Sequence, residues 1–106
     1  MAVDAERWAT LPTAEQMANI GSEVGRTAKW ILKGKTDLAR GAYLRALELQ
    51  DLTIKYGRVG QNGRRELLKE LCRARECFNG AFLSSDIDML KYLDKYFTQV
   101  AAICRR

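Results

Sequence analysis

The chain contains no histidine and only one proline, Pro12, among its 106 residues. Without histidine, a protein loses the commonest general base, the usual partner of a nucleophilic Ser or Cys, and the commonest metal ligand. Its three cysteines are too few to supply the four ligands of an ordinary zinc site. We therefore expect no catalytic residues, no metal and no cofactor, and a protein that is not an enzyme.

The cysteines are also too few, and odd in number, for a disulfide framework. Cys72 and Cys77 lie five residues apart, which separates them by about 140° around a helix. No apolar run approaches the ~20 residues that a membrane-crossing helix needs, and the start, "MAVDAERWATLPT", lacks the pattern of a secretory signal. These features predict reduced thiols, no membrane association and a cytoplasmic location.

Hydrophobic residues make up 47% of the chain and charged residues 29%, which is ample for one core. The apolar residues recur with a helical period, so we predict an all-α fold, an antiparallel four-helix bundle. Its helices are expected from Thr13 to the turn at Gly34, from Thr36 or Asp37 to Gly57, from about 64 to 78 or slightly beyond, and from a capping Ser85 to the end. Residues 13–106 then form a single four-helix domain, and residues 1–12 an extension, poorly ordered or packed on the bundle.

Two helices have unusual compositions. The first carries a strip of small residues that should let a second helix approach closely: Ala14, Ala18, Gly21, Gly25 and Ala28. The second is apolar over more than half of its circumference, from Leu38 to Tyr56. A helix of this kind is buried on two sides, so we expect it to be the central helix or to contribute to a dimer interface. The "GRVGQNG" segment that follows is expected to be a flexible loop.

The clearest candidate for a binding surface is the stretch "GRTAKWILKGK". A helical wheel places Trp30 on the polar side of its helix, with Arg26 and Lys33 one turn away on the same face. Such a cluster can bind a protein partner, or stack a nucleic-acid base and contact phosphate. Alternatively, Trp30 packs under the N-terminal segment, against Trp8 or Leu11.

Further basic residues need partners. Arg45 falls within the apolar arc of the second helix, and Arg75 borders the core face of the third, so each is a candidate buried or pocket charge. Asp51 and Asp94 are the candidate partners, and the alternative is that these side chains extend to the edge of the bundle. Arg65, Lys69 and Arg73 form a basic stripe that interleaved glutamates should neutralise.

Two resemblances bear on function. "KGKTDLARGAYLRALEL" resembles the second helix of a tetratricopeptide motif, although no second copy follows. Segments such as "RALELQDLTI" and "RRELLKELCRARECF" look like those of short bacterial helical proteins that are similar to the HEPN class of four-helix domains. Many HEPN domains are ribonucleases that need a histidine, which this chain lacks. The resemblance therefore implies the non-catalytic, partner-binding side of that class, whose members often pair with nucleotidyltransferases.

The net charge of +5 is compatible with nucleic acid or with an acidic protein. We predict a non-enzymatic helical interaction module that binds a protein partner or a second copy of itself. The alternatives are a nucleic-acid-binding protein that uses the basic face around Trp30, and a HEPN-like partner subunit of a nucleotidyltransferase.

Overall fold

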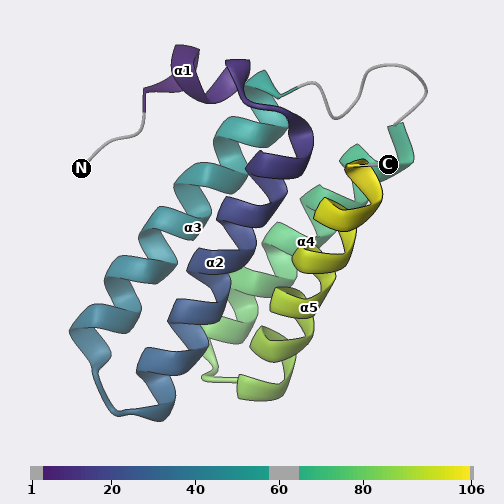
Figure 1. Ribbon diagram of the computed structural model, residues 1–106. Coiled ribbons are helices and arrows are strands. Elements are labelled where there is room, and N and C mark those ends of the chain that lie inside the picture. Colours follow the sequence, from purple (N-terminus) through teal and green to yellow (C-terminus); the bar gives the residue numbers. More distant parts are fainter. Residues whose placement is uncertain (1–3, 58–64, 106) are drawn as a thin grey trace.

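The computed structural model describes residues 4–57 and 65–105 (Figure 1). These residues form five α-helices and no strand: α1 (Ala5–Thr10), α2 (Thr13–Leu32), α3 (Thr36–Tyr56), α4 (Arg65–Leu83) and α5 (Ile87–Cys104). The predicted all-α class is confirmed, but the predicted count of four helices is wrong. Apart from Gly57, the segment expected to be a flexible loop lies outside the described residues.

The additional helix, α1, lies within the segment expected to be an extension. The carboxylate of Asp4 caps it by accepting hydrogen bonds from the N–H groups of Glu6 and Arg7. Trp8 is buried, with 5% of its surface exposed, and its Nε1–H donates a 2.9 Å hydrogen bond to Oγ1 of Thr53 on α3. Six residues are too short to show an apolar stripe, and the buried side chain of Trp8 attaches this helix to α3.

α2 packs against α3 and α5, and α3 packs against α1, α2 and α4. The second long helix therefore has neighbours on more than one side, as expected, but it is not buried all round. Leu38, Leu44 and Tyr56 of α3 are exposed over 48%, 54% and 47% of their surfaces. The wide apolar arc that the sequence indicates for α3 is therefore present, but many of its residues face solvent rather than the core.

The small residues of α2 explain its close contact with α5, as predicted. A Cβ atom built at Gly21 would lie 3.1 Å from the Cβ of Phe97, and one at Gly25 would lie 3.0 Å from a carboxylate oxygen of Asp94. Both distances are shorter than ordinary van der Waals contact. Gly21 therefore lets the backbone of α2 approach the Cβ of Phe97, whereas at Gly25 the nearest atoms are the flexible end of the Asp94 side chain.

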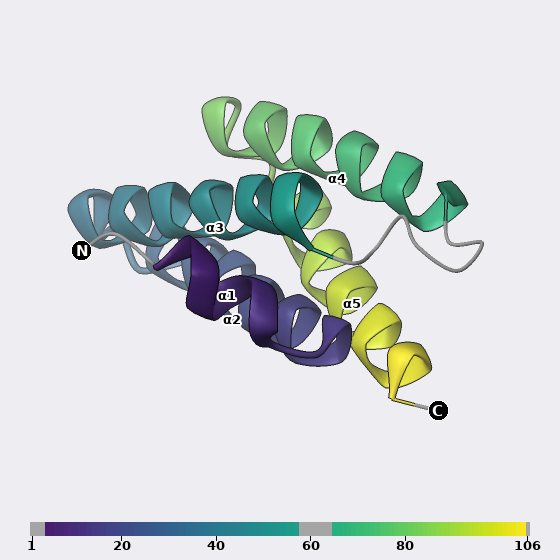
Figure 2. The ribbon, with the colours of Figure 1, turned by 90° about the horizontal axis from the view of Figure 1, so that it is seen from above.

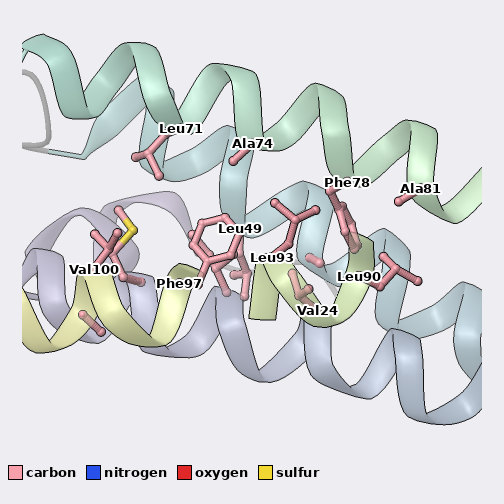
Figure 3. Packing of buried hydrophobic residues seen from close by; sticks show 14 of the residues in the cluster. Val24, Leu49, Leu71, Ala74, Phe78, Ala81, Leu90, Leu93, Phe97 and Val100 are labelled. Atoms are coloured by element: carbon pink, nitrogen blue, oxygen red, sulfur yellow. The ribbon is translucent and has the colours of Figure 1, made fainter. Parts of the chain in front are cut away.

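The four long helices alternate in direction along the chain (Figure 1). Viewed from above, α4 lies on the far side of the molecule from α2 (Figure 2). The core between them comes from all four long helices (Figure 3), and its fully buried members include Met17, Ile20, Val24, Phe78, Leu90 and Phe97. Tyr43 of α3 holds α4 in place by stacking on Phe82, with ring centroids 3.8 Å apart.

The helix ends follow the sequence only in part. Gly34 has the predicted left-handed conformation after α2, with φ of 70°. Pro12 rather than Thr13 occupies the N-cap of α2, without a side-chain hydrogen bond. Asp86 rather than Ser85 caps α5, by accepting from the N–H of Met89. The third predicted helix, expected to end at 78 or slightly beyond, continues as α4 to Leu83.

Across the described residues, none of the helices combines the length and apolarity needed to span a membrane.

Candidate protein-binding surface

The surface begins with a buried carboxylate between α2 and α3. Glu23 is only 6% exposed, although it is charged. It lies seven residues after Gln16 and four before Thr27, so these three polar side chains follow one side of α2, and all three are buried. A buried carboxylate needs a cation and hydrogen-bond donors to offset its lost hydration.

Two arginines meet that need. Arg26, one turn along α2, donates from Nη1 to one oxygen of Glu23, and Arg45 of α3 donates from Nε to the other. Their side chains are 56% and 52% exposed. Arg45 is therefore not the buried charge that the sequence suggested: the buried member of the pair is Glu23. Neither of the expected carboxylates, Asp51 or Asp94, is its partner.

Sequence reasoning missed Glu23 because the apolar stripe of α2 was read from its aliphatic residues alone. The signal was present: Glu23 lies directly before the core residue Val24 and four residues before the buried Thr27. A charged residue at that position must find a partner on a neighbouring helix. Its contact with Arg45, however, joins residues 22 positions apart and cannot be read from local periodicity.

Trp30 lies on the same side of α2 and is half-buried. Among the described residues it does not pack against the hydrophobic core cluster. The ammonium groups of Lys29 and Lys33 lie 5.3 and 5.6 Å from the centroid of its ring. These distances allow cation–π attraction. Trp30, Arg26 and Lys33, the residues singled out in the sequence, therefore do lie together, and Lys29 joins them.

The contact between Glu23 and Arg45 also sets the register of the two helices. Trp30 follows Glu23 by seven residues on α2, and Leu38 precedes Arg45 by seven residues on the antiparallel α3. Seven residues are almost two helical turns, and they return to nearly the same face. Trp30 and Leu38 therefore lie level with each other, and Leu38 is 48% exposed. We call Arg26, Lys29, Trp30, Lys33 and Leu38 the Trp30 surface.

Residues 4–12, the part of the N-terminal segment that the structure describes, do not cover Trp30. The backbone oxygens of Trp8 and Leu11 accept hydrogen bonds from Nε2 of Gln16. Trp30 lies 14 residues farther along α2, a distance of roughly 21 Å at the helical rise. The interpretation that Trp30 packs against Trp8 or Leu11 is therefore wrong.

Arg75, the other arginine predicted to be a buried or pocket charge, lies on α4, away from this surface. It is half-buried and binds Asp51 of α3 through two hydrogen bonds, the longer of them 3.3 Å from Nη2 to Oδ2. The hydrogen bond to Asp51 raises the pKa of the Arg75 guanidinium above its ordinary value. This pair joins α3 to α4 and leaves Arg75 no free role in a pocket.

Comparison of the chain with protein-family models, with curated proteins and with solved structures finds no match. The resemblances to HEPN domains and to a tetratricopeptide helix therefore stay predictions.

Proposed function

We propose that this protein is a non-enzymatic interaction module that binds a protein partner through the Trp30 surface. The observation that supports this most strongly is the position of Trp30, which is half-buried, off the core and flanked by two lysine ammonium groups. Residues that dominate protein interfaces are most often Trp, Tyr and Arg, surrounded by polar groups that exclude water. The Trp30 surface has this composition, and Leu38, level with Trp30 on α3, adds exposed apolar area.

The engagement of the arginines favours a protein over nucleic acid. Nucleic-acid binding draws most of its affinity from cations that neutralise phosphates. Arg26 and Arg45 already share the carboxylate of Glu23, so part of their charge is balanced within the protein. Lys29 and Lys33 are held over the Trp30 ring, the face that a stacked base would use.

The charge of the surface favours an acidic partner. Lys29, Lys33 and Arg26 are exposed on it, whereas its carboxylate, Glu23, is buried. Two copies of the protein joined through this surface would bring like charges together, which disfavours self-association at this site. We propose that the four long helices act as an antiparallel four-helix bundle, a scaffold that holds α2 and α3 in this register.

The test is affinity capture with three versions of the protein: wild type, Trp30→Ala, and Leu44→Ala as a control. Leu44 is an exposed apolar residue of α3 outside the Trp30 surface. We expect a protein that wild type and Leu44→Ala retain from nuclease-treated lysate and that Trp30→Ala loses. Reconstitution with that purified protein should give the same order of affinities. Because Trp30 is off the core, its replacement should change the free energy of unfolding by less than about 1 kcal/mol.

Two outcomes would contradict the proposal. If nuclease treatment removed everything that wild type captures, nucleic acid would be the partner. If Trp30→Ala lost about 3–5 kcal/mol of stability, as expected for a buried aromatic, Trp30 would be a structural residue.

A further inference from the structure

A groove of about 290 Å³ lies between α4 and α5, away from the Trp30 surface. Its walls are apolar: Ala74 of α4, Met89 and Leu93 of α5, and the side chains of Tyr92 and Tyr96. The small side chain of Ala74 leaves space opposite the larger residues of α5; Ala74 and Leu93 both contribute to the adjoining core (Figure 3). This volume is at the small end of the range for ligand sites.

The groove also contains polar groups, some of which already have a hydrogen-bond partner. The hydroxyl of Tyr96 donates a 2.9 Å hydrogen bond to Oε1 of Glu70, which joins α5 to α4. Burial, together with this bond to a carboxylate, raises the pKa of the Tyr96 hydroxyl, so it keeps its proton and remains a donor. The carboxylate of Glu70 is therefore already engaged inside the groove.

Arg73, one turn after Glu70 on α4, also lines the groove. Within the described part of the chain it forms no ion pair, whereas its neighbours Lys69 and Arg75 bind Glu66 and Asp51. The sequence-based expectation that this basic stripe is neutralised throughout is therefore wrong at Arg73. A guanidinium presents several donors in a planar fork that matches a carboxylate.

We propose that this groove binds a small aromatic carboxylate, with its ring between the side chains of Tyr92 and Met89 and its carboxylate on Arg73. Tyrosine rings and a methionine thioether both interact favourably with an aromatic ring. An amine is disfavoured, because Arg73 would repel it and because one oxygen of Glu70 already accepts a hydrogen bond from Tyr96. This site is independent of the proposed binding of a protein at the Trp30 surface.

Cys77 provides a direct readout, because it is exposed and lines the groove. Cys72, also exposed on α4, lies outside it and is a control within the same molecule. The experiment measures alkylation of each cysteine by iodoacetamide with and without 2-naphthoate, using peptide mass spectrometry. At ten times the dissociation constant, occupancy should slow alkylation of Cys77 about tenfold and leave Cys72 unchanged. Equal rates at Cys77 with and without 2-naphthoate, or equal slowing of both cysteines, would overturn the proposal.

A probe of opposite charge and a pair of charge-matched variants test the role of Arg73. We expect 2-naphthylmethylammonium to protect Cys77 much less than 2-naphthoate does. Arg73→Gln should weaken protection by 2-naphthoate about tenfold, whereas Lys69→Gln, which removes the same charge one turn away and outside the groove, should not. Stronger protection by the amine, or an unchanged affinity in Arg73→Gln, would overturn the assignment of the ligand as an anion.

Discussion

The two sides of α2 are built by opposite means. Toward α5, the helix omits side chains: Gly21 and Gly25 bring its backbone against Phe97 and Asp94. Toward α3, it buries polar side chains, among them Glu23, whose carboxylate binds Arg45. The first side holds its neighbour by shape, and the second adds an ion pair between Glu23 and Arg45. Close packing tolerates no added volume, whereas a hydrogen-bonded contact fixes which residues face each other and so determines what α2 and α3 present to solvent.

The largest effect is expected from adding volume on the α5 side. Gly21→Val places its Cβ 3.1 Å from the Cβ of Phe97, which cannot move away without moving the backbone of α5. We expect a loss of about 2–3 kcal/mol in the free energy of unfolding, as for overpacked cores, measured by urea denaturation. The matched control is Gly80→Val on α4, where an added Cβ meets nothing within 4 Å. Equal losses in the two variants would show that helix propensity, rather than contact with Phe97, controls the effect.

A smaller loss is expected on the α3 side from Glu23→Gln. The amide keeps the shape but loses the charge that holds Arg26 and Arg45, and both arginines are exposed enough to be solvated instead. We expect a loss of about 1–2 kcal/mol by urea denaturation. Glu66→Gln, which breaks the exposed pair with Lys69, should cost less than about 0.5 kcal/mol. If the two changes cost the same, the buried position of Glu23 would contribute nothing to stability.

The smallest effect returns to the α5 side and depends on pH. Burial raises the pKa of the Asp94 carboxyl above its ordinary value of 3.8, so the folded protein binds this proton more tightly than the unfolded chain does. Ionisation of Asp94 therefore lowers the free energy of unfolding as the pH rises through the raised pKa. We expect Asp94→Asn to be more stable than wild type at neutral pH, with a difference that shrinks as the pH falls from the raised pKa to 3.8. A difference independent of pH would contradict this cause.

The sequence predicted the features that arise from local periodicity. The helical period of the apolar residues predicted the all-α fold, and the small residues of α2 predicted the close approach of a second helix, which is α5. The sequence failed on features that depend on contacts between distant residues. The partner of Arg45 and the burial of Trp8 depend on which helices become neighbours, and a wheel of one helix carries no such information.

The candidate site was predicted in part. Arg26, Trp30 and Lys33 lie together because they are one turn apart on one helix, which the sequence alone determines. Leu38 joins them only through the register that Glu23 and Arg45 set between α2 and α3. The groove between α4 and α5 was not anticipated, because it results from a small residue, Ala74, lying opposite larger residues of a separate helix.

The different positions of the two tryptophans give the protein a pair of natural optical probes. Trp8 lies in the core with its indole N–H bonded to Thr53, whereas Trp30 lies half-buried at the surface. Indole emission depends on the polarity around the ring, and collisional quenchers reach only rings near solvent. In a Trp30→Phe variant, the remaining fluorescence would follow unfolding through Trp8. In a Trp8→Phe variant, it would follow occupancy of the surface through Trp30, so that one spectrometer could separate loss of structure from gain of a partner.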